Sequence, residues 1–191
     1  MSARHLTLAS ASPRRRELLA RLGLEADAIA PADIDETPFR TELPRDYAMR
    51  MAREKAAAAA ATGGFVLAGD TVVAAGRRIL PKADDAATAR LCLALLSGRR
   101  HRVFSAIALR APDGTLRERL SDTVVRFKAL SAEEIADYLA SGEWRGKAGG
   151  YAIQGRAEGL IQWIRGSHSG VMGLPLHETR GLLKSAGFTL G

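Results

Sequence analysis

The chain has 191 residues, of which 47% are hydrophobic and 26% are charged, and its net charge is +7. This composition is typical of a folded protein with a sizeable core and excludes a disordered chain. One cysteine, Cys92, excludes an internal disulfide, and no stretch reaches the about 18 to 20 apolar residues of a membrane span. Because no secretory signal is recognisable near the first residues, we expect a cytoplasmic protein with no membrane partner.

Arginine dominates the positive charge, with 23 of the 28 cationic side chains. The planar guanidinium fork suits phosphate groups, so a phosphate-bearing partner is one explanation. The other is a composition bias, since the chain also holds 35 alanines. The cations form no tail or block and only 5% of residues are aromatic, which disfavours stable binding to nucleic acid.

Strand and helix signals alternate along the chain without repeats or a break in composition, which predicts one α/β domain over residues 1–191. Ser12 and Pro13 suit the N-cap and first position of a helix, and six consecutive alanines at residues 56–61 favour a long helix before them. In the first half, the expected elements are a strand at 5–9, a helix at 13–22, a strand at 26–30, an acidic loop at 33–38 and a helix at 44–61.

The second half is expected to place an antiparallel hairpin among these units. Asp84 or Asp85 suits the N-cap of the helix at 84–96. Pro112-Asp113-Gly114 is the strongest turn signal, and Ser131 with Glu134 forms a capping box. The expected elements are two strand pieces at 65–75 interrupted at residues 69–71, a helix at 84–96, strands at 103–109 and 116–127, a helix at 131–140, a strand at 160–165, a loop at 166–175 and a helix ending near 186. The sheet is therefore expected to be mixed.

Three arginines follow one another in the first turn of the helix expected at residues 13–22. Positive side chains there oppose the helix dipole, whose positive end is the N-terminus. A phosphate would relieve this conflict, held by the helix N–H groups, the hydroxyls of Ser10 and Ser12 and the guanidinium groups of Arg14 and Arg15. The alternative is that the arginines point into solvent.

Asp70 interrupts an apolar strand signal, where a buried carboxylate needs a hydrogen bond, an ion pair or a metal. Strand ends that face a cleft are frequent catalytic positions, although a lone Asp at a bend is more often structural. Asp33, Asp35 and Glu36 in the acidic loop either offer oxygen ligands to a hard cation such as Mg2+ or form a solvated turn.

Lysine is scarce in this arginine-rich chain, and a compact ammonium differs from a guanidinium fork in what it binds. Each lysine is therefore a candidate for a specific role, on a weak signal. The five are Lys55, Lys82, Lys128, Lys147 and Lys184.

Five segments in this order resemble the Maf family of nucleoside triphosphate pyrophosphatases, and the similarity covers essentially the whole chain. Each segment alone is a weak signal, whereas five in register are very specific. They are Leu8-Ala9-Ser10-Ala11-Ser12-Pro13-Arg14-Arg15 followed by Glu17-Leu18-Leu19, then Gly69-Asp70-Thr71-Val72-Val73, then Leu96-Ser97-Gly98-Arg99-Arg100-His101, then Lys147-Ala148-Gly149-Gly150-Tyr151-Ala152-Ile153-Gln154-Gly155, and finally Gly166-Ser167-His168-Ser169-Gly170-Val171-Met172-Gly173-Leu174-Pro175.

The resemblance implies hydrolysis of a nucleoside triphosphate between its α- and β-phosphates, giving a monophosphate and pyrophosphate, with a divalent metal such as Mg2+ or Mn2+. It also implies the architecture of inosine triphosphate pyrophosphatases, an elongated mixed sheet flanked by helices with a cleft between two lobes. Family members are cytoplasmic, are often homodimers and have been linked to inhibition of septum formation.

By the same resemblance, Asp70 matches the proposed proton acceptor, and Asp70 and Glu36 match positions that hold the metal. The expected reaction is attack of an activated water on the α-phosphorus with in-line departure of pyrophosphate. We favour metal ligation for Asp70, with base character shared through the water, because an unperturbed Asp with a pKa of about 3.9 is a weak base at neutral pH. The matched phosphate-binding positions are Ser10, Arg14, Arg15, Lys55 and Lys82.

Substrate choice is implied by three positions of the resemblance. Arg14, Thr71 and Gln154 fall where the branch directed at dTTP and UTP carries Arg, Thr and Gln, whereas the branch that resembles 7-methyl-GTP pyrophosphatases has Trp, Gln and Glu. A Gln amide has one acceptor and two donors, which suits the carbonyl and imide edge of uracil or thymine. The family's usual Gly-Lys-Pro is here Pro81-Lys82-Ala83, which changes the backbone around Lys82.

The main hypothesis is therefore a dTTP/UTP pyrophosphatase activity. The alternatives are a 7-methyl-GTP pyrophosphatase of the same family, and a regulator of cell division that binds a nucleotide or nucleic acid without turnover. The polar residues around Asp70 favour an enzyme, because binding alone would not require that carboxylate beside an acidic loop.

Overall fold

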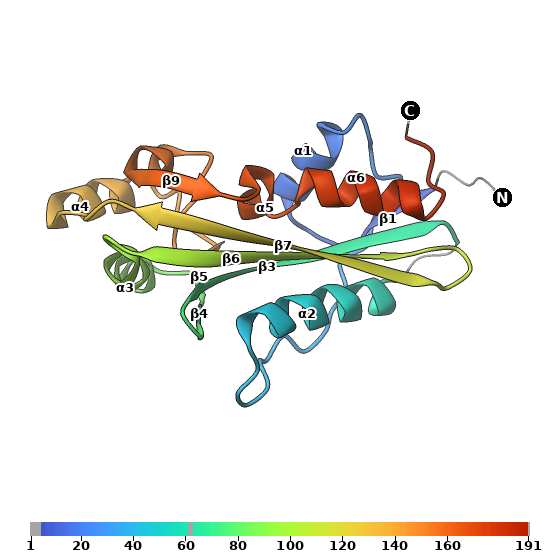
Figure 1. The fold of residues 1–191 in the computed structure, drawn as a ribbon, viewed down its shortest axis with the longest axis horizontal. Coiled ribbons are helices and arrows are strands. Elements are labelled where there is room, and N and C mark those ends of the chain that lie inside the picture. Colours follow the sequence, from blue (N-terminus) through green and yellow to red (C-terminus); the bar gives the residue numbers. More distant parts are fainter. Residues whose placement is uncertain (1–4, 61–62, 191) are drawn as a thin grey trace.

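The computed structural model describes residues 5–60 and 63–190, and within them a long, twisted sheet of seven strands forms the centre of the molecule (Figure 1). Its strands are β1 (Leu6–Leu8), β2 (Ala28–Ile29), β3 (Phe65–Ala75), β4 (Arg78–Leu80), β6 (Arg100–Arg110), β7 (Leu116–Phe127) and β9 (Ile161–Arg165). The order is β2-β1-β3-β6-β7-β9, with β4 also beside β3. β1 is parallel to β2 and β3 and the other pairs are antiparallel, which confirms the expected mixed sheet.

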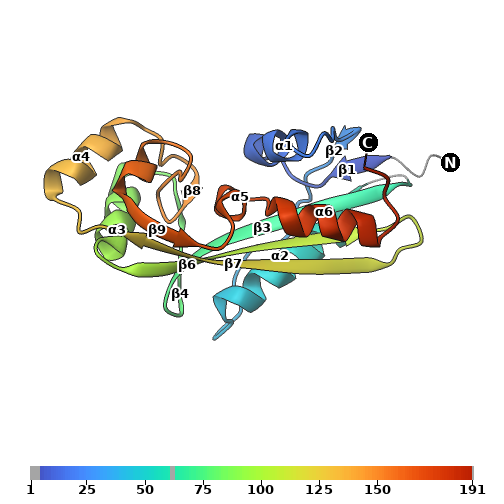
Figure 2. The same ribbon diagram turned by 45° about the horizontal axis from the view of Figure 1, so that its top comes forward.

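Helices cover both faces of the sheet and one of its ends (Figure 1). On one face lies α2 (Pro44–Ala58), and on the other lie α1 (Pro13–Ala20), α5 (His168–Met172) and α6 (Leu176–Ser185). The end lobe contains β9 and a second sheet, whose two strands are β5 (Lys82–Ala83) and β8 (Lys147–Ala148). It also contains α3 (Ala86–Leu96), α4 (Ala132–Ala140) and the 3-10 helix η1 (Arg156–Leu160). Figure 2 shows this lobe standing apart from the α1 side of the sheet, so the expected elongated, two-lobed arrangement is confirmed. None of the helices within residues 5–60 and 63–190 has the length and apolarity needed to cross a membrane.

One edge of β3 is paired in two separate places. β1 pairs with residues 65–67 and β4 pairs with residues 73–75. Neither strand pairs with residues 68–72 on that edge, and Asp70 is the midpoint of this gap. The opposite edge of β3 is continuous with β6 from Val66 to Ala74. The gap therefore leaves the middle of a central strand without a strand neighbour on one side, while the sheet stays continuous on the other.

Small side chains allow α2 to lie close to the sheet. The buried residues of this interface are mostly alanines, from α2, β3 and β6: Ala48, Ala52, Ala56, Ala68, Ala74, Ala106 and Ala108. α2 ends at Ala58, earlier than predicted, and residue 61 lies outside the described residues. Arg110 of β6 donates hydrogen bonds to the carbonyls of Ala57 and Ala59, at 2.9 and 3.1 Å, and so satisfies groups at the helix end.

Local capping predictions are confirmed at three helices. Ser12 and Asp85 each accept a hydrogen bond from the backbone N–H three residues later, at 3.4 and 2.7 Å, at the starts of α1 and α3. Ser131 and Glu134 form the expected capping box of α4. The hairpin of β6 and β7 is also present.

Two expectations of the sequence are wrong. The two strand pieces expected at 65–75 are one strand, because residues 69–71 continue the ladder opposite residues 105–107 of β6. The Asp70 carboxylate does not interrupt β3, since it pairs with Lys55 on the covering helix. The loop expected at 166–175 contains α5, whose N-cap Ser167 accepts a hydrogen bond from the Gly170 N–H at 2.9 Å.

A buried histidine lies where β6 enters the end lobe. His101 is 2% exposed, and its Nε2 lies 2.8 Å from the hydroxyl of Tyr151. Its ring also packs against Phe127 and Tyr151, with 5.5 Å between centroids in each case. Burial disfavours the imidazolium form and lowers the pKa of His101 from 6.5 to about 4. His101 is therefore neutral in the folded protein near pH 7.

This histidine should make the protein less stable in mild acid. The unfolded chain has the higher His101 pKa, so the contribution of His101 to stability is complete above pH 6.5 and is lost as the pH falls toward about 4. The loss is at most roughly 3 kcal/mol. We expect the melting temperature to fall over this interval, and to fall less in His101→Gln, which does not titrate there. Equal falls in the two proteins would contradict the prediction.

Candidate active site

A cavity of about 590 Å³ opens between the end lobe and the α1 side of the sheet, at the gap in the edge of β3. Every site residue matched through the family resemblance lines it, although these residues come from six separate segments. They are Ser10, Arg14, Arg15, Glu36, Lys55, Asp70, Thr71, Lys82 and Gln154. The structure thus brings the predicted residues together, while their individual roles stay predictions.

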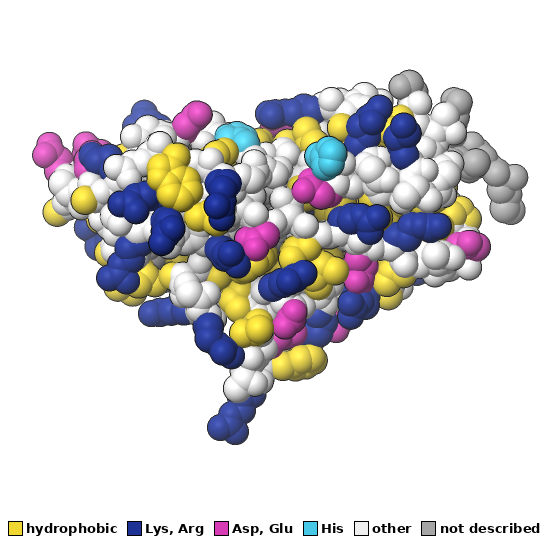
Figure 3. Space-filling view, in the orientation of Figure 1, with side chains coloured by type: hydrophobic (Ala, Val, Ile, Leu, Met, Phe, Trp, Pro, Cys, Tyr) yellow, Lys and Arg dark blue, Asp and Glu magenta, His cyan; other side chains and the backbone are white. Residues whose placement is uncertain are grey.

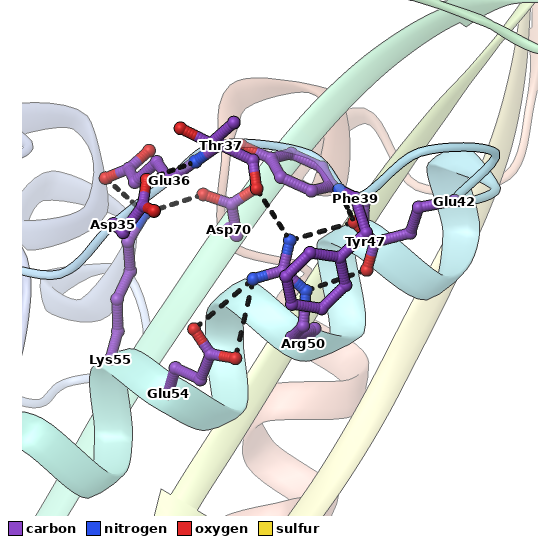
Figure 4. Close-up of polar contacts among 10 residues, drawn as sticks. All are labelled: Asp35, Glu36, Thr37, Phe39, Glu42, Tyr47, Arg50, Glu54, Lys55 and Asp70. Atoms are coloured by element: carbon purple, nitrogen blue, oxygen red, sulfur yellow. Dashed lines mark hydrogen bonds and ion pairs between the residues drawn. The ribbon is translucent and has the colours of Figure 1, made fainter.

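One ammonium group bridges two carboxylates of the cavity (Figure 4). Lys55 Nζ, on α2, lies 2.8 Å from Asp70 Oδ1 on β3 and 2.9 Å from Glu36 Oε1 in the acidic loop. Lys55 and Asp70 are only 8% and 7% exposed. Lys82 Nζ approaches the other oxygen of Glu36, at 3.9 Å. The buried Asp70 carboxylate therefore has the partner that its position requires.

Two side chains of α2 fasten the acidic loop in place (Figure 4). The Tyr47 hydroxyl donates to the Glu36 carbonyl at 2.7 Å, and Arg50 donates to the Thr37 carbonyl at 3.1 Å. Arg50 also pairs with Glu42 at 2.7 Å, farther along the same loop. These contacts hold Glu36 beside the ammonium of Lys55.

Of the three acids expected to serve as ligands in this loop, only Glu36 lines the cavity. Asp35 accepts a hydrogen bond from the Thr37 N–H at 2.8 Å, which stabilises a turn. Asp33 is also absent from the cavity wall. Asp35 therefore stabilises a turn, as one of the two interpretations of this loop predicted. Glu36 and Asp70 are the remaining candidates for binding a cation.

Glu36 is ionised in this setting. Burial alone would raise the pKa of Glu36, but the hydrogen bond and charge of Lys55, with the charges of Lys82 and Arg15, outweigh it and hold the pKa below its ordinary value. The side chain therefore offers carboxylate oxygens at neutral pH.

The oxygen donors of the cavity fit a divalent cation only in part. Within the described ranges, no group of three or more His, Cys, Asp and Glu side chains is placed to hold a metal. Mg2+ in nucleotide enzymes is usually bound by one or two carboxylates together with phosphate oxygens and water. Asp70 and Glu36 therefore suit an ion that is also bound by a triphosphate.

The arginines at the start of α1 contact carbonyl groups from a distant segment. Arg15 Nε donates to the Gly173 carbonyl at 2.9 Å, and its Nη1 donates to Ser10 Oγ at 2.8 Å. Arg14 Nε donates to the Met172 carbonyl at 3.4 Å. Met172 and Gly173 end α5, where a helix carries negative partial charge. This contact relieves part of the conflict between the arginines and the dipole of α1.

Both of these arginines are poorly solvated. Burial lowers the pKa of Arg14 and of Arg15, and for Arg15 the charge of Asp70 partly offsets this effect. An arginine nevertheless stays protonated at neutral pH. Arg16, the third arginine, is exposed and lies outside the cavity, so it is the one of the three that points into solvent. An anion in the cavity would stabilise the charges of Arg14 and Arg15.

The other two positions expected to set substrate choice differ in their surroundings. Thr71 Oγ1 lies 3.1 Å from Ser105 Oγ and 3.5 Å from Arg15 Nη2, within a polar part of β3 and β6. Gln154 is exposed and lines the cavity from the end lobe. Its amide is thus accessible to a ligand.

Sequence reasoning missed two cations of the cavity, Arg145 and Lys147. Lys147 belongs to a segment that carries the family resemblance and is one of only five lysines, a signal that was present but weak. No pattern around Arg145 indicates a ligand. Among the described residues, two carboxylates thus line the cavity beside six cationic side chains, which are Arg14, Arg15, Lys55, Lys82, Arg145 and Lys147.

Known proteins resemble this chain over nearly its whole length. A dTTP/UTP pyrophosphatase from Novosphingobium aromaticivorans is 67% identical over 184 residues, which are 95% of this chain and 92% of that protein. Proteins of the same name from Rhodospirillum rubrum and Zymomonas mobilis are 64% and 59% identical. Their alignments cover 97% of this chain and 90% and 93% of the respective relatives.

A solved structure shows a weaker likeness. The crystal structure of a nucleoside-triphosphatase / dITP/XTP pyrophosphatase from Mycobacterium abscessus has a TM-score of 0.42 and 25% identity, over 67% of this chain and 76% of that one. A likeness at this TM-score is too distant to bear on the fold or activity. The family model described as Maf-like protein, in contrast, matches residues 5–186. Together with relatives of such high identity, this match shows that the chain belongs to the Maf-like protein family, as its five motif segments predicted.

Proposed function

We propose that this chain is a nucleoside triphosphate pyrophosphatase that hydrolyses dTTP and UTP to the nucleoside monophosphate and pyrophosphate. The observation that carries the proposal is a cavity in which Asp70 lies among six cationic side chains. Hydrolysis of a phosphoric anhydride needs a group that takes a proton from water and cations that stabilise the phosphates. The relatives named dTTP/UTP pyrophosphatase support this substrate class.

The charge and size of the cavity favour a small polyanion. Its cations outnumber its carboxylates by six to two, and a volume of about 590 Å³ suits a small molecule. Over the face shown in Figure 3, Lys and Arg side chains are spread from end to end with acidic side chains among them. This distribution supports a nucleotide substrate over a nucleic-acid partner, which would favour one continuous basic surface.

In the proposed reaction, Asp70 accepts a proton from the water that attacks the α-phosphorus, and pyrophosphate departs on the opposite side. Lys55 holds the carboxylate of Asp70 in position through the 2.8 Å ion pair. Arg14, Arg15 and Lys82 bind phosphate oxygens and stabilise the negative charge that develops on the leaving group.

Neutral donors and a cation complete the proposed phosphate site. Ser10 and the first N–H groups of α1 offer hydrogen bonds to phosphate oxygens. Asp70 and Glu36 would hold Mg2+ or Mn2+ together with the triphosphate. When bound, such an ion neutralises phosphate charge and lowers the pKa of a water.

Three features implied by the family resemblance stay predictions: a homodimeric state, a cytoplasmic location and a link to septum formation. The homodimer is checked by light scattering of the purified protein. The other two require the protein in its own cell.

Replacing Asp70 by Asn should remove most of the activity. Asn cannot accept the proton, so we expect release of pyrophosphate from dTTP or UTP, with Mg2+ or Mn2+, to fall about 100- to 10,000-fold. Asp122→Asn is a matched control, because Asp122 pairs with Arg102 on the sheet at 3.3 Å and does not line the cavity. If Asp70→Asn is folded by circular dichroism and keeps near-normal turnover, the role of Asp70 is refuted.

A panel of nucleoside triphosphates tests the substrate. We expect more pyrophosphate from dTTP, UTP or a base-modified pyrimidine triphosphate than from 7-methyl-GTP. A clear preference for 7-methyl-GTP would overturn the branch indicated by Arg14, Thr71 and Gln154. Binding without turnover of any nucleotide would favour a regulator.

Replacing Gln154 by Glu should weaken the selection of the base. The carboxylate lacks both amide donors, so we expect KM for dTTP and UTP to rise about tenfold or more with a smaller change in kcat. Gln162→Glu makes the same chemical change on β9, outside the cavity, and should leave KM unchanged. Equal KM values for the two variants would remove Gln154 from the base site.

A further inference from the structure

The two-stranded sheet of β5 and β8 brings two lysines to the cavity. Lys82 pairs with Ala148 in this ladder, and Lys147 pairs with Ala83, so the lysines occupy adjacent rungs. Both line the cavity. Lys82 is an expected phosphate-binding residue. Lys147 lies in one of the motif segments, but neither the family resemblance nor the proposed reaction assigns it a role.

Two glycines determine where β8 lies. Gly149 has φ +69°, and a Cβ on it would lie 2.7 Å from Cγ1 of Val73 on β3. Gly150 has φ +71°, and a Cβ on it would lie 3.1 Å from Cα of Ala89 on α3. Only glycine adopts this backbone at such close contact without strain. The glycines thus seat β8 against the strand that carries the catalytic carboxylate and fix the backbone of Lys147 at the cavity.

The ammonium of Lys147 has a positive neighbour and, within the described residues, takes part in no ion pair. Its hydrogen bond is to the Arg145 carbonyl, at 2.9 Å. None of the ion pairs in the described part of the chain includes Lys147. Burial lowers the pKa of Lys147, the charge of Arg14 lowers it further, and Glu143 opposes this only in part. A half-buried cation in such surroundings is stabilised when an anion binds beside it.

Arg14 and Lys147 belong to opposite walls of the cavity. Figure 2 shows α1, which carries Arg14, and β8, which carries Lys147, on the two sides of the space between the lobes. Uracil and thymine are neutral at pH 7, so the anionic part of a dTTP or UTP substrate is its triphosphate. A triphosphate between these walls would contact both cations.

We propose that Lys147 is a further substrate-binding residue, which contacts the triphosphate from the end lobe while Arg14 contacts it from α1. This inference rests on the proposed function and extends it. Lys82 and Lys147 then act together as the phosphate-binding side chains of one small sheet. The glycines that follow Lys147 serve the same purpose, because they hold that sheet against β3.

The test compares Lys147→Gln with Lys184→Gln. Both substitutions remove one positive charge, but Lys184 is exposed on α6 and outside the cavity. Two quantities are measured: the calorimetric Kd for inorganic tripolyphosphate with Mg2+, and KM and kcat for dTTP. We expect Lys147→Gln to raise the Kd and the KM at least about tenfold, with a smaller change in kcat, and Lys184→Gln to change neither. Lys147→Arg should recover part of the loss, because it retains the charge.

The outcomes separate this inference from the proposed function. If the unaltered protein hydrolyses dTTP but Lys147→Gln matches Lys184→Gln in both Kd and KM, Lys147 is not a substrate residue and the proposed function stands. If the unaltered protein hydrolyses no nucleoside triphosphate, the proposed function fails, and tripolyphosphate binding still decides whether Lys147 contacts a polyphosphate. Absence of tripolyphosphate binding in the unaltered protein would overturn the inference, as would failure of Lys147→Arg to bind better than Lys147→Gln.

Discussion

The buried ion pair between Lys55 and Asp70 connects the architecture of this protein with its proposed chemistry. It joins α2, on one face of the sheet, to the middle of β3, and both side chains are almost fully buried. Removing one partner of such a pair leaves a buried charge without compensation, which is strongly destabilising. The position of α2 along β3 is therefore coupled to the position of the carboxylate. The alanines of α2, β3 and β6 allow this arrangement, because larger side chains would hold the helix farther from the strand.

The gap in the edge of β3 explains how Asp70 can line the cavity although it lies in a central strand and is largely buried. β1 and β4 pair with the two ends of that edge and leave residues 68–72 without a partner strand, while β6 pairs continuously on the other side. Pairing with β6 therefore holds the backbone of β3 in place, while the gap on the other edge lets Asp70 line the cavity. The acidic loop and α2 bring Glu36 and Lys55 to this point, and α1 brings Arg14 and Arg15. Site residues held by regular elements in this way are positioned more precisely than residues on free loops.

Sequence reasoning identified residues that line one cavity more accurately than it identified the strands and helices around them. Short-range signals were sufficient for Ser12 and Asp85 as caps and for the turn between β6 and β7, since these depend on neighbouring residues. The sequence indicated an interruption at residues 69–71 and assigned it to β3. In the structure β3 is continuous, and the interruption lies between its two partner strands, β1 and β4. No local pattern reveals a gap between two partners that are distant in sequence. The same limit applies to the carbonyls of Met172 and Gly173, which reach the arginines of α1 only in the folded protein.

The surplus of positive charge in the cavity has a consequence for the protein without substrate. Arg14, Arg15 and Lys147 all have lowered pKa values, because burial removes water and, for Arg15 and Lys147, the neighbouring charge of Arg14 adds repulsion. These groups therefore destabilise the empty cavity, and the fold must hold them through contacts elsewhere, such as the glycine seat of β8 and the carbonyl end of α5. A bound polyanion removes that repulsion, so ligand binding should raise the free energy of unfolding. Asp70 and Glu36 limit this repulsion, because both carboxylates form ion pairs with Lys55 and compensate its charge. The cavity is thus arranged in advance for a negatively charged reactant, and little reorientation of charge is needed when it reacts.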